Sequence, residues 1–344
     1  MATLKNTTIS DTGFLKIATG TNAQRPSSPA LGDFRYNTEE EVFEVYDGSE
    51  WVGAGGGGAS LYDFTTATFT APQTGSNAPS LTQVRNNISG GDAFKNNTEY
   101  LSVVSGIVYW SAPADGTYRV ECWGARGGGP CTRQGTNGGL GARMRGDFNF
   151  TSGQVLYLVI GQEGIRQTNG WGGGGGGGGT FVWDPNSLSQ PLIAAGGGGG
   201  SGQNSNGQQD GRTGGTGGTG SNGGGSGGSS GSASGSSGIC GGGGGQGWNG
   251  GSSYHCGGGF TWPTLYNNPT GYSSGGHSTN MGGFGGGSGS YGGSGGGGGW
   301  SGGGSGGWSY AGYGGGGGSI NSGSNQSNTS GVKSGGGQIT ITLL

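Results

Sequence analysis

The chain has 344 residues, of which 99 are glycine, 28% are hydrophobic and 9% are charged. A single ordinary core cannot extend through such a chain, so the apolar residues must be concentrated in parts of it. The net charge of −3 comes without a basic patch, which argues against nucleic-acid binding, and no apolar run approaches the ~18 residues of a membrane-spanning helix.

Residues 1–54 have the pattern of a small β module. Residues 34–37 and 42–46 alternate as two strands, and an Asp47-Gly48 turn follows them. A meander of this size buries little surface, so we expect it to be stable mainly in an oligomer or against a partner. The first residues lack the apolar stretch of a signal peptide, so we expect the chain to be made in a cytoplasm.

Part of this module resembles a known element. Residues 23–52 read AQRPSSPALGDFRYNTEEEVFEVYDGSEWV, which resembles a repeat-like module of tailed-phage fibres and other virion structural proteins. In those families the module lies in the shaft or attachment part of a fibre and is commonly trimeric. The resemblance implies a virion location, contacts with other virion proteins through residues 1–54, and a homotrimer.

Residues 55–60 form a glycine hinge, and residues 61–171 form a β-rich section. Short β-branched and aromatic runs separated by turn residues suggest an antiparallel β-sandwich or jelly roll. Residues 338–344 alternate as a strand and have no other apolar surface to pair with, so we expect them to complete this sandwich. The predicted strands are 62–69, 100–104, 107–110, 118–123, 144–150 and 155–160.

Residues 172–337 are glycine-rich and lack any Asp, Glu, Lys or Arg between Arg212 and Lys333. Such a composition is typical of disorder, since glycine loses the most backbone entropy on folding. Three features favour order: many large aromatics, no charge to keep the chain solvated, and glycine blocks separated by non-glycine clusters. The ordered alternative is a bundle of polyglycine II helices, each with three residues per turn, joined by hydrogen bonds between helices.

A second set of motifs lies within residues 107–344. The segments are WSAPADGTY (110–118), ECWGARGGG (121–129), LVIGQEG (158–164), GTFV (179–182) and PLIAAG (191–196). Their order resembles the glycine-rich domain shared by phage adhesins and the ectodomains of anaplastic-lymphoma-type receptor tyrosine kinases. The resemblance implies a sandwich carrying an inserted polyglycine II bundle. In T-even-type tail-fibre-tip adhesins, loops at the far end of the bundle contact the bacterial receptor.

Little in the sequence indicates catalysis, a metal or a cofactor. No phosphate-binding GxxxxGK[ST] motif occurs, and His255 and His277 have no acidic residue nearby. Four cysteines match no zinc spacing, although Cys240, His255 and Cys256 leave a metal site as an alternative. Free thiols are the simpler interpretation, with a late disulfide as the alternative. We therefore expect a protein that is not an enzyme.

The aromatic residues of the glycine-rich region are the candidate binding residues. Rings among Asn, Ser and Thr suit contacts with sugars or protein loops, while the alternative is that they bury the ends of the bundle. Residues 180–183 and 192–195 are instead expected to form a buried hairpin. The candidates are Trp248, Phe260, Trp262, Tyr266, Tyr291, Trp300, Trp308, Tyr310 and Tyr313.

Together these patterns predict an all-β virion fibre or adhesin that binds a glycan or an outer-membrane protein of a bacterial host. One alternative is a purely structural capsid, neck or baseplate fibre without a specific receptor. Another is an extracellular glycine-rich matrix or ice-binding protein, against which the missing signal peptide argues.

Overall fold

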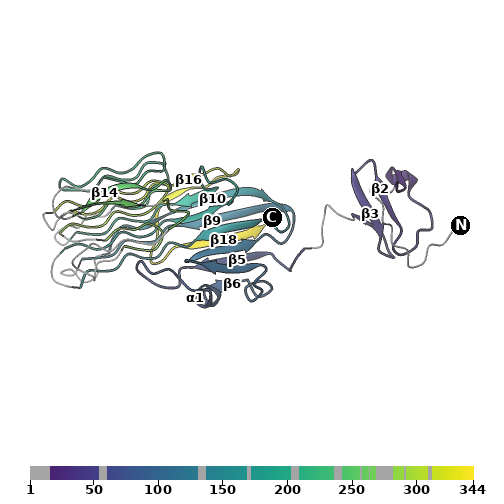
Figure 1. The fold of residues 1–344 in the computed structure, drawn as a ribbon, viewed down its shortest axis with the longest axis horizontal. Coiled ribbons are helices and arrows are strands. Elements are labelled where there is room, and N and C mark those ends of the chain that lie inside the picture. The colour runs from purple at the N-terminus through teal and green to yellow at the C-terminus, as the bar shows by residue number, and fades with distance from the viewer. Residues whose placement is uncertain are drawn as a thin grey trace. The chain divides into compact units, whose positions relative to one another are not determined.

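The structure is a computed structural model with two compact units, residues 1–61 and 62–344. It describes residues 16–53, 60–130, 137–168, 172–202, 209–235, 242–255, 258–262, 264–268, 282–289, 292–308 and 312–344. The fold is all-β with almost no helix, and it contains several antiparallel sheets (Figure 1). The sequence also predicts short strands at residues 8–10 and 14–18. Residues 8–10, 14 and 15 lie outside the described residues, and residues 16–18 are not in a strand, since β1 begins at Thr19.

The first unit contains one four-stranded sheet. Strand β1 pairs in parallel with β2, and the other neighbours are antiparallel. The two predicted strands are confirmed with their expected bounds. The elements are β1 (Thr19–Gly20), the 3-10 helix η1 (Asn22–Gln24), β2 (Phe34–Asn37), β3 (Val42–Tyr46) and β4 (Trp51–Gly53).

This small sheet buries polar side chains and exposes aromatic ones. Arg35, Asn37 and Glu44 are all less than 5% exposed, and Arg35 lies opposite Glu44 in the β2–β3 register. Phe34 and Phe43, on the same two strands, are exposed and stack with ring centroids 5.5 Å apart. The interior is therefore held mainly by ion pairs and hydrogen bonds, and apolar surface is left for a neighbour.

The second unit contains two six-stranded sheets. The first has the strand order β17-β10-β9-β18-β5-β6. The C-terminal β18 lies between β9 and β5, in the middle of this sheet (Figure 1). Its strands are β5 (Thr66–Thr70), β6 (Ile88–Ser89), β9 (Gly116–Trp123), β10 (Gly141–Phe150), β17 (Thr329–Lys333) and β18 (Gln338–Leu343).

The second sheet has the order β16-β13-β12-β11-β8-β7. The expected hairpin at 180–183 and 192–195 is present as the antiparallel pair β12 and β13, and both strands are buried. The strands are β7 (Leu101–Val104), β8 (Ile107–Ser111), β11 (Val155–Val159), β12 (Thr180–Trp183), β13 (Ile193–Ala195) and β16 (Ile320–Asn321).

One apolar core lies between these sheets, as in a β-sandwich. It includes Phe69 and Ile339 from the first sheet and Trp110 and Leu158 from the second. Because side chains alternate along a strand, the second sheet also has an opposite face, which carries a separate apolar cluster containing Phe181 and Trp183. The second sheet is therefore covered by apolar contacts on both faces.

Several elements were not predicted from the sequence, including β1, η1, β6, β16 and β17. Helix α1 (Leu81–Asn86) begins at a capping box, in which the amide of Gln83 donates to the Ser80 hydroxyl. Strands β14 (Gly251–His255) and β15 (Gly258–Trp262) pair as a hairpin in a stretch expected to be loops. Strand β5 also begins four residues later than the expected start at residue 62.

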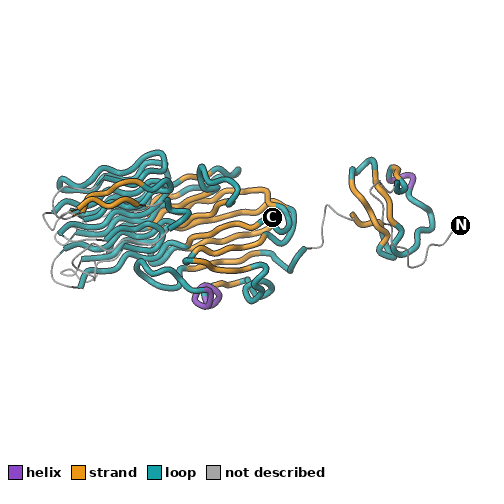
Figure 2. Tube along the Cα trace, viewed as in Figure 1, coloured by secondary structure: helices purple, strands orange, loops and turns teal. Residues whose placement is uncertain are grey.

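The glycine-rich segments lie side by side beyond one end of the sandwich strands and run in roughly the same direction as those strands (Figure 2). Their amides bond to neighbouring segments with a repeat of three residues. Gly197 and Gly200 donate to Gly298 and Gly295, both at an N···O distance of 2.8 Å. The next pair three apart, Gly198 and Ser201, donates to a different segment, at Ala125 and Gly128. Each segment is thus joined to neighbours on several sides.

Backbone packing in this region leaves no space for side chains at most positions. A Cβ atom added to Gly176 would lie 1.9 Å from the carbonyl oxygen of Gly296. Buried serines occupy a few interior positions, and their hydroxyls donate to backbone carbonyls, as Ser234 does to Gly303 and Ser294 to Gly312, both at 2.7 Å. These two buried hydroxyls are thereby satisfied within the region.

Candidate functional site

The hydrogen-bond register defines two ends of the glycine-rich region. The Trp300 amide donates to Gly318, two residues before β16, so Trp300 lies at the end next to the sandwich, here called the base. From Trp300 the chain runs outward to Gly307, whose amide donates to Ser221 at the other end, here called the tip. The strand end at Leu344 lies on the opposite side of the sandwich from the glycine-rich segments (Figure 1).

Aromatic residues at the base complete the outer cluster of the second sheet. Trp248 is fully buried and packs against Phe181 and Trp183, with ring centroids 6.0 and 5.4 Å away. Its indole Nε1 donates to the Leu188 carbonyl at 2.9 Å. The expectation that Trp248 presents its ring to a partner is therefore wrong. The ring instead shields the apolar outer face of the second sheet from water. Phe284 is buried in the same cluster.

Two further candidates are half-buried around this cluster. Tyr266 packs on Trp248 with ring centroids 5.1 Å apart. Trp300 also packs against the cluster, and its ring lies close to the backbone of Gly231, where an added Cβ would be 3.1 Å from Cη2. Both rings therefore pack at the base of the glycine-rich region, and only part of each ring is exposed to solvent.

The tip carries the most exposed candidate. Trp308 is 56% exposed, and it is the only exposed side chain among the five candidates whose burial the structure describes. Half-buried Tyr313 is also at the tip, because its backbone bonds to Ser221. The Tyr313 amide donates to the Ser221 hydroxyl at 2.9 Å, and the Tyr313 carbonyl accepts from the Ser221 amide. The tip therefore combines a free indole with a fixed turn.

That turn, residues 221–224, is closed by a hydrogen bond from the Gly224 amide to the Ser221 carbonyl. Asn222 has φ 54° and is exposed, and Gly223 has φ 72°. Asparagine and glycine adopt this left-handed backbone conformation more readily than other residues. The conformation fixes the direction in which the Asn222 side chain leaves the turn. The turn offers neutral hydrogen-bonding groups next to the backbone of Gly307, which precedes Trp308.

The remaining candidates cannot be placed in this way. Tyr291 and Tyr310 lie outside the described residues. For Phe260 and Trp262 the structure describes only the backbone, in β15, and not the burial of their side chains.

The chemistry available at the tip is that of uncharged recognition. The sequence has no charged residue between Arg212 and Lys333, so an acid–base pair cannot form from this stretch. A carboxyl with a shifted pKa does occur outside the tip, in the first sheet of the sandwich. Asp147 accepts a hydrogen bond from Arg119 Nε at 2.8 Å, and this bond lowers the pKa of the Asp147 carboxyl. Such an ion pair on paired strands is structural.

The described residues contain neither a candidate metal centre nor a candidate membrane-spanning helix. Among the described residues, no three or more His, Cys, Asp or Glu side chains gather in a way that could hold a metal ion. The described ranges likewise contain no helix with the length and apolar character needed to cross a bilayer. Cys122 is a buried free thiol, whereas Cys131, Cys240 and Cys256 lie outside the described residues. The sequence matches no known protein-family model.

Sequence reasoning overlooked one polar group with an unusual environment. Arg35 is buried in the first unit and faces a pocket, yet it was read only as part of an alternating strand. A signal was available, since Arg35 and Glu44 occupy facing positions in two strands whose other residues are largely aromatic or aliphatic. Opposite charges at paired strand positions indicate a specific ion pair.

Proposed function

We propose that this chain is a tailed-phage virion fibre or adhesin that attaches to the surface of a bacterial host without catalysis. The observation that carries the proposal is the distribution of aromatic residues in the glycine-rich region. Trp248 and Phe284 at the base are buried, whereas Trp308 at the tip is exposed. An indole in solvent at the end of the region, when the other candidates with described burial are buried or half-buried, suits binding rather than folding.

The glycine-rich segments are proposed to be polyglycine II helices. A helix with three residues per turn directs every third amide to the same side. This accounts for the donation from Gly197 and Gly200 to one neighbour and from Gly198 and Ser201 to another. A bundle anchored to the sandwich by β12, β13 and β16 would hold the tip rigidly, which reduces the ordering entropy lost on binding.

The receptor is proposed to be a glycan or an outer-membrane protein. Trp308 can stack on a sugar ring or an apolar loop, and the exposed Asn222 at the same tip can donate and accept hydrogen bonds. Because this stretch of the chain is uncharged, binding to the receptor should depend little on ionic strength.

The first unit is proposed to attach the chain to other virion proteins, in a homotrimer. The exposed stack of Phe34 and Phe43 supports a protein partner, because a module this small gains stability by covering such a surface. The chain would thus be a component of the virion, made in the host cytoplasm, with recognition at one unit and assembly at the other.

One observation favours the alternative of a purely structural fibre. Of the five candidates with described burial, four are buried or half-buried, and Trp248, Tyr266 and Trp300 belong to the base cluster. If Trp308 contacts another virion protein, the tip would serve assembly alone.

Binding of the purified protein to host cells distinguishes these functions. We would compare wild type with Trp308→Ser and with Leu344→Ser, a control at the other end of the unit with a similar exposed fraction of 59%. An adhesin predicts saturable binding that Trp308→Ser weakens at least about tenfold and Leu344→Ser leaves unchanged. Absence of binding by folded wild type to every host of the parent virus would instead support the structural fibre.

A further inference from the structure

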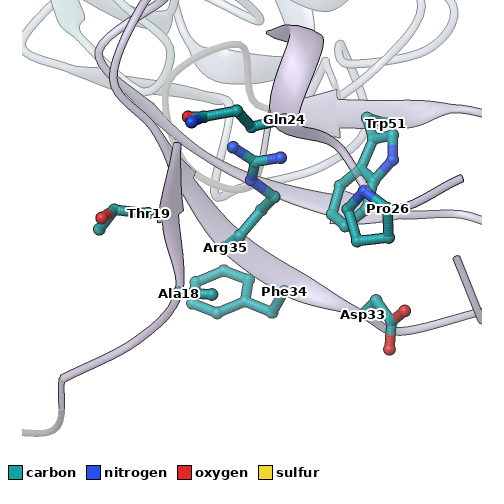
Figure 3. A pocket seen from close by; sticks show the side chains of 8 residues that line it. All are labelled: Ala18, Thr19, Gln24, Pro26, Asp33, Phe34, Arg35 and Trp51. Carbon is teal, nitrogen blue, oxygen red and sulfur yellow. The ribbon is translucent and has the colours of Figure 1, made fainter. Parts of the chain in front are cut away.

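The first unit contains a pocket of about 300 Å³ between β1, β2 and β4. Its walls combine apolar and polar side chains, with one guanidinium inside. Figure 3 shows the Arg35 side chain in the middle of these residues, with its guanidinium directed between Gln24 on one side and Trp51 with Pro26 on the other. The lining residues are Ala18, Thr19, Gln24, Pro26, Asp33, Phe34, Arg35 and Trp51.

The Arg35 guanidinium is held by two contacts, but one of its nitrogens makes no hydrogen bond within the described part of the chain. Its residue is 4% exposed. Nε faces Glu44 Oε1 at 3.3 Å, and Nη2 donates to the Thr21 carbonyl at 3.1 Å. Nη1 is buried and has no hydrogen-bond partner among the residues that the structure describes. A buried charged donor without an acceptor is costly, so this N–H is suited to an external oxygen.

The positive charge of Arg35 is also only partly balanced. Glu44 makes its shorter contact with Arg25, whose Nη2 lies 2.6 Å from Oε2. One buried carboxylate therefore serves two guanidinium groups. Arg25 has a second, half-exposed partner in Glu40 at 3.8 Å, which lies on the Arg25 side of the network. An additional negative charge near Arg35 would thus be stabilised.

The other lining residues restrict what kind of anion fits. The Arg35 guanidinium carbon lies 5.9 Å from the centroid of the Trp51 ring, and Phe34 and Pro26 add apolar surface. Asp33 points away from Arg35 in Figure 3, and its Oδ2 accepts from the Ala30 amide at 2.9 Å. The unpaired Nη1 donor, next to the apolar surface of Trp51, Phe34 and Pro26, suits one oxygen of a carboxylate on an apolar body.

We propose that this pocket binds a carboxylate attached to an apolar group, as presented by an acidic side chain of a neighbouring polypeptide. Arg35 Nη1 donates to the carboxylate, and Trp51, Phe34 and Pro26 enclose its carbon body. The pocket itself stands on the geometry of the first unit. Only the identity of the neighbour, another copy of the chain or a different virion protein, rests on the attachment role proposed above.

The test uses phenylacetate as a probe of the full-length protein, followed by ligand-observed NMR. Its neutral isostere phenylacetamide is the matched control ligand. We expect saturable phenylacetate binding in the millimolar range and at least tenfold weaker phenylacetamide binding, because a charge-assisted hydrogen bond is lost. Binding of the two ligands with equal affinity, or no saturable phenylacetate binding by folded protein, would overturn the proposal.

Two variants localise the site. Arg35→Lys keeps a cation for Glu44 but removes Nη1, and Ala18→Phe fills the pocket from an exposed lining position while keeping Arg35. Both should weaken phenylacetate binding at least about tenfold. Arg143→Lys is the matched control, since Arg143 pairs with Glu121 and lies 5.7 Å from the Trp123 ring but does not line this pocket. Undiminished binding by Ala18→Phe contradicts the assignment even if Arg35→Lys does not fold.

The source of the natural carboxylate is tested by sedimentation velocity with and without saturating phenylacetate. Dissociation of an oligomer by phenylacetate, and not by phenylacetamide, identifies another copy of the chain as the source. An unchanged oligomeric state together with specific phenylacetate binding identifies a different virion protein. Neither result depends on binding to host cells, so the pocket and the receptor-binding proposal fail or succeed separately.

Discussion

Replacing Gly198 by alanine should strongly destabilise the second unit. The added Cβ would lie 1.8 Å from the carbonyl oxygen of Gly139 and 2.3 Å from its carbon. Carbon and oxygen in contact are normally about 3.3 Å apart, so the two segments would have to separate by roughly 1.5 Å. The obstacle is backbone, which cannot rotate away as a side chain could.

The cost follows from the hydrogen bonds at this position. The Gly198 amide donates to Ala125 at 2.9 Å, its carbonyl accepts from Gly177 at 2.8 Å, and the adjacent Gly199 carbonyl accepts from Gly139 at 2.8 Å. Losing three such bonds at about 1 kcal/mol each, with about 1–3 kcal/mol for overpacking, gives about 4–6 kcal/mol. That is a large part of the 5–15 kcal/mol that is typical of the free energy of unfolding.

The assay is urea unfolding followed by tryptophan fluorescence, with Gly214→Ala as control. Gly214 is exposed, and an added Cβ would meet no atom within 4 Å, so its substitution should change the free energy of unfolding by less than about 1 kcal/mol. If Gly198→Ala unfolds at the same urea concentration as Gly214→Ala, the close packing of glycine backbones described here is wrong.

Three further outcomes are expected. Trp248→Ala should lower the free energy of unfolding by about 3–5 kcal/mol in urea, whereas Trp308→Ser should change it by less than about 0.5 kcal/mol; equal effects would contradict the division between base and tip. The Arg25 hydrogen bond lowers the pKa of Glu44 below its ordinary value of 4.5, so stability from this pair is complete above that pH and is lost as the pH falls through the folded pKa. Glu44→Gln should therefore weaken the acid dependence of unfolding of the first unit, and an unchanged acid profile would refute this. Burial raises the pKa of the Cys122 thiol, so a thiol reagent should react with it only after unfolding, and rapid reaction in the native protein would show that Cys122 is accessible.

Strands could be predicted from the sequence where apolar and polar residues alternate over several positions between turn residues. Residues 34–37 and 42–46 were found with their bounds because alternating aromatic or aliphatic residues end at turn residues. Helix α1 was missed because six residues give less than two turns, too few to show a helical period, and its main signal is the capping box at Ser80. Local pattern therefore predicts longer elements better than short ones.

The candidate site was less predictable, because exposure depends on hydrogen-bond register rather than on local sequence. Trp248 and Trp308 both stand among glycine, serine and asparagine, and no local feature distinguishes them. Two backbone hydrogen bonds, from Trp300 to Gly318 and from Gly307 to Ser221, place Trp300 at the base and Gly307 at the tip. Such pairing joins residues far apart in the sequence, so a local pattern does not reveal it.

The central claim, that the tip contacts the host surface, is tested most directly by photo-crosslinking. A benzoylphenylalanine would be placed at position 308 in one variant and at position 344 in another, two positions of similar exposure at opposite ends of the unit. After irradiation on host cells, we predict a crosslinked host-surface component from position 308 and none from position 344. Crosslinks to host cells from position 344 alone, or to virion proteins alone from position 308 in assembled particles, would contradict the account.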